Sequence, residues 1–98
     1  MTAQYIARSP RIAARLLGDE MIIISAEDSA LFSLNEVATA IWLAADGRTP
    51  LRRIVEQHVC EQYEVDAETA LRDAAELVRA LSAHGILLTS ERPFPEAA

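Results

Sequence analysis

The feature that most constrains the fold is a change of hydrophobic period at Asn35. Before this residue, short runs rich in β-branched or alternating apolar residues are separated by turn residues. After it, apolar residues recur at helical spacing. The runs at 11–17, 20–26 and 30–35 predict three strands, and Gly18-Asp19 predicts a two-residue hairpin turn between the first two. Short turns between short strands indicate an antiparallel meander.

Three helices are predicted after the strands. Asn35 can cap the first helix, and Gly47 can end it. The dipeptide Thr-Pro at 49–50 supplies a cap followed by proline at the first position of the second helix. Asp66 can cap the third helix, which Gly85 ends. Strands followed by helices predict an α+β domain in which three helices cover one face of a three-stranded antiparallel sheet.

The two ends of the chain are predicted to be flexible. Residues 1–10 show no clear period, and residues 89–98 hold two prolines without one, so the folded domain is expected at 11–88. No apolar run approaches the roughly 20 residues that cross a bilayer. The lone cysteine, Cys60, excludes an internal disulfide and favours a reducing, cytoplasmic location.

Charge and motif content exclude several classes of function. The net charge of −6 opposes binding to nucleic acid or to an anionic membrane surface, because both need a basic protein surface. His58 and Cys60 lie two residues apart on a predicted helix and point in different directions, so no metal site is expected. No G-x-S-x-G motif occurs, and the three glycines are used by turns and helix ends. We therefore expect no catalytic residues, no metal and no cofactor, and the chain is not predicted to be an enzyme.

The third predicted helix carries two arginines that have two interpretations. Arg72 and Arg79 lie two turns apart with Ala75 between them, beside the apolar arc of the helix. They form either a solvated flank balanced by Glu68 and Glu76, or one wall of a groove that attracts an acidic ligand. The residues alone leave both interpretations open.

The segment 31–88 resembles the PqqD family throughout. The features that carry the resemblance are an aromatic-x-Leu-Asn strand end, an Ala-x-x-Ile-Trp helix with an Asp-Gly stop, a Leu-x-x-Ile-Val helix and a Tyr-x-Val-Asp entry to a last helix ending in Gly-Ile-Leu. In this chain they are Phe32, Leu34 and Asn35; Ala38, Ile41 and Trp42; Asp46 and Gly47; Leu51, Ile54 and Val55; Tyr63, Val65 and Asp66; and Gly85, Ile86 and Leu87. With the preceding strands, the resemblance covers about residues 12–88.

The resemblance implies a winged-helix-like domain called a RiPP recognition element, which is a peptide chaperone without catalytic activity. Such a domain binds the leader of a ribosomally made precursor peptide and presents it to a modifying enzyme, often a radical SAM protein, in the biosynthesis of pyrroloquinoline quinone (PQQ) or another natural product. The leader lies antiparallel along the third strand, between that strand and the third helix. Carried over by position, the peptide-binding residues are Ser29, Ala30, Leu31, Phe32, Ser33 and Leu34 on the strand, and Arg72, Ala75 and Arg79 on the helix.

Within the predicted strand, Phe32 and Leu34 share the face that the helices cover, whereas Leu31 and Ser33 point the other way. Two alternatives to the peptide adaptor stay open. One is a winged-helix DNA-binding protein, which the acidic third helix disfavours. The other is a structural or oligomerisation subunit, such as a homodimer in which the free strand edge pairs with its own copy.

Overall fold

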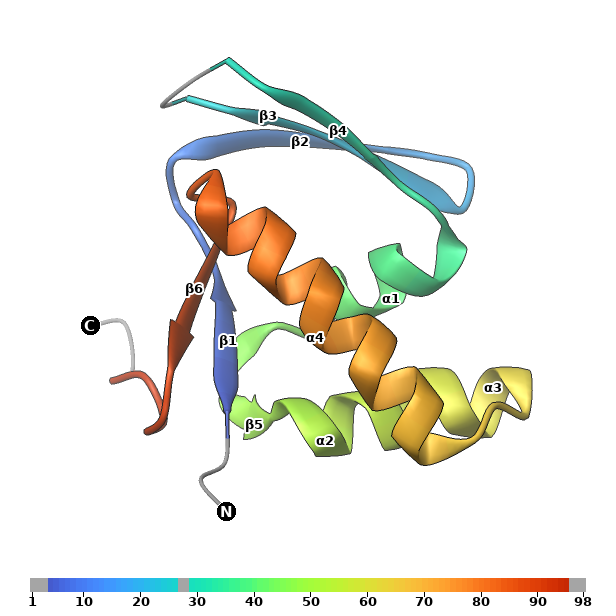
Figure 1. Ribbon diagram of the computed structural model, residues 1–98. Helices are drawn as coiled ribbons and strands as arrows, with labels where there is room; N and C mark the ends of the chain where they lie inside the picture. The colour runs from blue at the N-terminus through green and yellow to red at the C-terminus, as the bar shows by residue number, and fades with distance from the viewer. Residues whose placement is uncertain (1–3, 27–28, 96–98) are drawn as a thin grey trace.

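In the computed structural model, which describes residues 4–26 and 29–95, two antiparallel sheets lie against a group of helices (Figure 1). The first sheet consists of β2 (Ile12–Leu17), β3 (Glu20–Ser25) and β4 (Leu31–Leu34), with β3 in the centre. Gly18 takes a φ of +65° in the turn between β2 and β3, as the predicted hairpin requires. The predicted three-stranded meander is confirmed.

A second sheet was not predicted. Its central strand is β1 (Tyr5–Arg8), flanked by β5 (Asp46–Pro50) and β6 (Leu87–Ser90), both antiparallel to it. Within residues 4–10 and 89–95 the structure differs from the expected flexible ends, because Ile6 is fully buried and the Phe94 N–H donates to the Gly47 carbonyl at 2.8 Å, while residues 1–3 and 96–98 of those predicted ends lie outside the described residues. These strands have four or five residues and partners far away in sequence, so a local period does not reveal them.

The described residues contain the three predicted helical segments. The first is α1 (Glu36–Leu43) and the third is α4 (Ala67–Ala83). The second is a continuous run of α2 (Leu51–Val55), the π-helical turn η1 (Glu56–Cys60) and α3 (Glu61–Tyr63). Two predicted caps are confirmed: Asn35 accepts from the Ala38 N–H at 2.8 Å, and Asp66 accepts from the Thr69 N–H at 3.1 Å.

The predicted end of α4 is also confirmed. Gly85 has a φ of +72° and donates its N–H to the Ser82 carbonyl, while the N–H of Ile86 reaches the Leu81 carbonyl at 2.9 Å. These two bonds satisfy carbonyls of the last turn in the Schellman arrangement.

Three local predictions were wrong. Helix α1 ends at Leu43, and Gly47 lies instead in β5 with a φ of +76°, where an added Cβ would stand 3.0 Å from the Phe94 side chain. Thr49 also lies in β5, so Pro50 is the N-cap residue of α2 and the helix begins one residue later than predicted. The helical spacing of Leu51, Val55 and Val59 also predicts Tyr63 on the buried face of the second helix, but Tyr63 is 36% exposed, because the longer π turn before it shifts the helical register.

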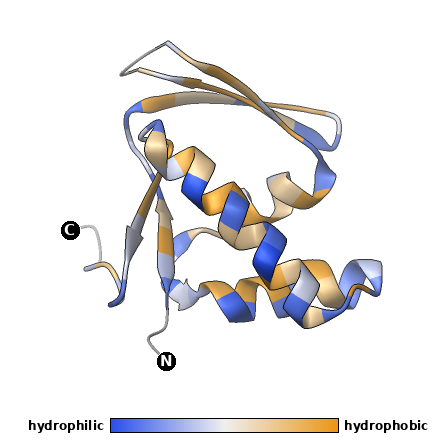
Figure 2. Cartoon of the chain, in the orientation of Figure 1, coloured by the Kyte–Doolittle hydropathy of each residue, from blue (hydrophilic) through white to orange (hydrophobic). Residues whose placement is uncertain are grey.

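The core lies between the two sheets and the helices, where the apolar faces of β3, β4, α1, α2 and α4 meet (Figure 2). Its residues are Ile6, Met21, Ile23, Leu34, Ile41, Trp42, Ala45, Leu51, Ile54, Val55, Val59, Ala70, Ala74, Val78, Leu81, Ile86 and Leu87. The α+β class is confirmed, while the likeness to a winged helix stays a prediction. Within the described residues, none of the helices combines the length and the apolar character that crossing a membrane requires.

Candidate functional site

Strand β4 is an edge strand whose backbone offers hydrogen-bonding groups to an added chain. It pairs with β3 from Leu31 opposite Ile24 to Leu34 opposite Met21, and no other strand of the described residues pairs with it. The Ser25 N–H donates to the Ala30 carbonyl at 2.9 Å, so Ser25 and Ala30 face each other as a hydrogen-bonded pair just before β4. Because bonded and non-bonded pairs alternate in an antiparallel ladder, Leu31 and Ser33 direct their N–H and C=O groups away from β3.

The structure places four of the six predicted strand residues in β4. Ser29 has a φ of +56° and donates its N–H to the Ser25 carbonyl, so it is not extended like a strand residue, and Ala30, whose carbonyl accepts from the Ser25 N–H, directly precedes β4. Leu34 is buried and Phe32 packs against the core, while Leu31 is 63% exposed and Ser33 is exposed. The two faces therefore have the predicted parity.

The junction between β4 and α1 is fixed by Thr39, a buried residue of α1. Its hydroxyl accepts from the Met21 N–H at 3.1 Å and donates to the Leu34 carbonyl at 3.0 Å. A helix side chain thus bridges β3 and β4 where their pairing ends. This bridge fixes the end of the edge strand relative to α1.

The C-terminal end of α4 contacts the other end of β4. The rings of His84 and Phe32 have their centroids 4.8 Å apart, and the Ser25 hydroxyl donates to the His84 carbonyl at 2.8 Å. Aromatic rings at this distance and in a tilted arrangement attract one another. These contacts hold α4 beside the edge strand.

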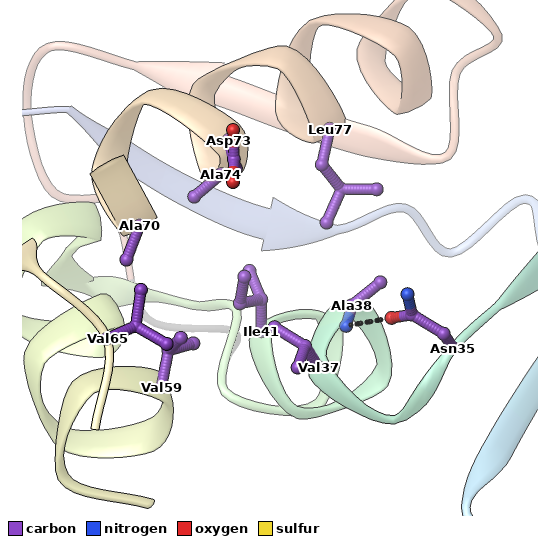
Figure 3. Close-up of a pocket in the computed structure, with 10 residues that line it drawn as sticks. All are labelled: Asn35, Val37, Ala38, Ile41, Val59, Val65, Ala70, Asp73, Ala74 and Leu77. Atoms are coloured by element: carbon purple, nitrogen blue, oxygen red, sulfur yellow. Dashed lines mark hydrogen bonds between the residues drawn. The ribbon is translucent and has the colours of Figure 1, made fainter. Parts of the chain in front are cut away.

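A pocket of about 390 Å³ opens where β4 ends, between α1 and α4 (Figure 3). Helix α4 contributes Ala70, Asp73, Ala74 and Leu77, and the rest of the lining is Asn35, Val37, Ala38, Ile41, Val59 and Val65. Most of these side chains are apolar, and they converge on the space from both sides of the pocket. An apolar cavity with a few polar groups is typical of a binding site.

The pocket and β4 lie on one flank of α4, and the three predicted helix residues lie on the other. Residues of an α-helix are roughly 100° apart around its axis. Around the axis of α4, the angle between the centres of two stripes is therefore roughly 150°. One stripe contains Arg72, Ala75 and Arg79, and the other contains Asp73, Leu77 and His84. None of the three predicted residues lines the pocket. The sequence pattern identified the apolar arc of α4 but not which flank of that arc faces the strand.

Metal-ligating side chains do not gather at one place in the part of the chain that the structure describes. No group of three or more His, Cys, Asp or Glu side chains among them is placed to hold a metal ion. Near the pocket, Glu36 accepts a hydrogen bond from the Tyr63 hydroxyl, which raises the pKa of Tyr63 above its ordinary value of 10.0.

A family model described as coenzyme PQQ synthesis protein D (PqqD) matches residues 20–87, which is more than half of the chain. The chain belongs to the PqqD family. This match confirms the resemblance seen in the sequence, and it contains the whole of β4, the pocket lining and His84. Strand β1, the centre of the second sheet, lies outside the match to PqqD.

A solved structure is similar to this PqqD-family chain over most of its length. It is the structure of TbiB1 in complex with the TbiA(β) leader peptide, with a TM-score of 0.74 and 26% sequence identity. The similarity covers 83% of this chain and 93% of that one. A search of curated protein sequences found no match.

Proposed function

We propose that this protein is a non-catalytic peptide-binding adaptor, a RiPP recognition element that captures the leader of a ribosomally made precursor peptide. The leader adds to the first sheet as a fourth strand, antiparallel to β4. The adaptor then presents the precursor to a modifying enzyme in natural product biosynthesis, such as a radical SAM protein of PQQ biosynthesis. The lone Cys60 is consistent with a cytoplasmic site of action.

The observation that carries the proposal is the unpaired edge of β4 beside the pocket. Leu31 and Ser33 direct backbone donors and acceptors outward, which is the requirement for β-strand addition. Main-chain bonds of this kind give affinity for any extended peptide, and neighbouring pockets select side chains. The similar structure of TbiB1 contains a leader peptide, which supports a peptide as the ligand of this chain.

The proposed complex divides the leader side chains into two sets. Side chains alternate between the faces of a strand, so one set shares the inner face with Phe32 and Leu34 and lies towards α4 and the pocket. The other set continues the outer face that carries Leu31 and Ser33. We propose Asp73, Leu77 and His84 as the helix residues that meet the inner set, in place of Arg72, Ala75 and Arg79.

Replacing Ser33 by proline tests the adaptor directly. Because the Ser33 N–H points away from β3, Ser33→Pro removes a donor offered to the leader without removing a bond to β3, and the proline ring obstructs an added strand. We expect the leader to bind about tenfold or more weakly, because a backbone bond and close approach are both lost. Calorimetric titration with the leader peptide of the similar structure, and with leader segments encoded beside this gene, measures the change.

Ser33→Ala is the matched control, because it removes the hydroxyl and keeps the backbone donor. We expect it to bind like the wild type, with the amides of Leu31 and Ser33 becoming protected from hydrogen exchange when peptide is added. Circular dichroism verifies that both variants are folded. A folded Ser33→Pro protein that binds the leader with unchanged affinity contradicts strand addition at β4.

The same preparations distinguish the two other classes of function. A dimer that uses the β4 edge would dissociate in Ser33→Pro and would leave no leader site in the wild type, which sedimentation over a concentration series would detect. A DNA-binding protein would bind generic duplex with a steep salt dependence. The net charge of −6 opposes that second result.

A further inference from the structure

We propose that Asp73 selects leaders in which a lysine or arginine lies next to the apolar side chain that fills the pocket between α1 and α4. This inference rests on the proposed function and adds a charge requirement to it. Asp73 is the charged member of the pocket lining, and the other lining residues are apolar except Asn35. The Asn35 side chain is already used as the cap of α1.

The carboxylate of Asp73 is exposed and has no neutralising partner within residues 4–26 and 29–95. Its neighbours one turn away on α4 are Thr69, Ala70, Glu76 and Leu77, none of which is a cation. Two other carboxylates that adjoin lining residues are engaged, since Glu36 accepts from Tyr63 and Asp66 accepts from the Thr69 N–H. Asp73 is therefore a negative charge at the mouth of the pocket that the described residues leave unpaired.

A carboxylate beside an apolar cavity favours a ligand with both an apolar and a cationic part. The apolar part leaves water for the pocket, while an ammonium or guanidinium at the rim forms a charge-assisted hydrogen bond with Asp73. The net charge of −6 also attracts a cationic segment at long range. An acidic side chain in the same place would be repelled.

The position of the cation along the leader follows from the direction of the strand. In a leader antiparallel to β4, the segment beyond Leu34 is N-terminal to the residues that pair with Ser33 and Leu31. The pocket begins at Asn35, just past the end of β4. The apolar anchor and its cationic neighbour are therefore expected in the N-terminal part of the bound segment. Side chains two residues apart share a face, so the cation should lie within about two residues of the anchor.

A display selection tests this inference without a known leader. Random peptides of about 12 residues, enough at roughly 3.3 Å per residue to cover β4 and the pocket, are selected on the wild type, Asp73→Asn, Asp73→Lys and Ser33→Pro. We expect the wild type to enrich lysine or arginine within about two positions of an apolar anchor. Asp73→Asn should keep the anchor and lose the charge preference, and Asp73→Lys should enrich acidic residues instead.

The matched control is Glu76→Gln, which neutralises an exposed carboxylate on the same helix that does not line the pocket. It should enrich the same peptides as the wild type. For the best synthetic peptide, exchanging its lysine for glutamine should weaken binding to the wild type about threefold to tenfold and leave binding to Asp73→Asn unchanged.

Each outcome separates the inference from the proposal on which it rests. Enrichment of an anchor without a charge preference, or the same preference in Asp73→Asn and Glu76→Gln, overturns the role of Asp73 and leaves the adaptor intact. Peptides that bind equally well to Ser33→Pro, or a wild type that enriches no peptide, overturn the adaptor and the selectivity together.

Discussion

At the scale of single residues, Thr39 explains why the strand end and the first helix of this chain form such a distinct sequence signature. Its hydroxyl satisfies the Met21 N–H and the Leu34 carbonyl, both at the end of the β3–β4 ladder. A buried donor or acceptor left without a partner is costly, so the hydroxyl does more than fill space. The edge that we propose for peptide binding depends on this one side chain for its position.

Thr39→Val tests that dependence, because valine has nearly the same shape and no hydroxyl. We expect the free energy of unfolding to fall by about 1–3 kcal/mol, since the substitution leaves two buried backbone groups without partners. Thr39→Ser keeps the hydroxyl and should lose only about 1 kcal/mol for the missing methyl group. Urea denaturation measures both variants, and a Thr39→Val protein as stable as the wild type would show that the bridge is unimportant.

Trp42, the most conspicuous residue of the signature, has a structural role. Its side chain is 7% exposed, and the Arg8 guanidinium lies over the ring at 5.5 Å from the centroid. Arg8 also donates to the carbonyls of Trp42 and Leu43 at the end of α1. A cation at a helix C-terminus interacts favourably with the carbonyls there. The tryptophan thus joins α1 to β1 and does not contribute to the pocket.

At the scale of elements, the backbone of the short strand β5 is held by the side chain of its first residue, Asp46. The Arg48 N–H, and then the N–H and hydroxyl of Thr49, donate to this carboxylate. These bonds lower the pKa of Asp46 below its ordinary value of 3.8, the Arg48 N–H having the largest effect. A carboxyl whose pKa is lower in the folded state stabilises the fold above its unfolded pKa.

We therefore predict a pH-dependent difference in stability between the wild type and Asp46→Asn. At pH 7 the wild type should be more stable by about 0.2–1 kcal/mol, a small difference because Asp46 is exposed and solvent screens its carboxylate. The difference should shrink as the pH falls through 3.8 and vanish below the folded pKa. Thermal unfolding of both proteins from neutral to acid pH measures it, and a difference that does not depend on pH would contradict the assignment.

The sequence predicted well those elements whose signals are local. The β2–β3 turn at Gly18, the caps at Asn35 and Asp66 and the stop at Gly85 were all visible, because each depends on a few adjacent residues. Gly47 was misassigned because its positive φ serves the contact with Phe94, a residue 47 positions away. The edge strand followed from the same local pattern, whereas the helix residues that we propose for the leader, Asp73, Leu77 and His84, did not, because periodicity does not show which flank of a helix meets a strand.

At the scale of the whole molecule, the second sheet makes the N-terminal segment part of the core. Ile6 in the central strand β1 is fully buried, whereas Leu88 in the neighbouring strand β6 is 42% exposed. We predict that Ile6→Ala lowers the free energy of unfolding by about 2–5 kcal/mol, as for other buried large residues. Leu88→Ala, the control in the same sheet, should cost less than about 1 kcal/mol. If Ile6→Ala left the free energy of unfolding unchanged, the prediction of a flexible N-terminal segment would be favoured again.

The strand order β5-β1-β6 also has a consequence for synthesis of the chain. Of these three strands the central one, β1, is synthesised first, whereas its neighbours β5 and β6 come from the middle and the later part of the sequence. A nascent chain halted before Leu87 would hold Ile6 without one of the flanking strands that cover it. Because contacts between distant segments form late, we expect the edge that meets the peptide to be built from local pairing before this second sheet closes.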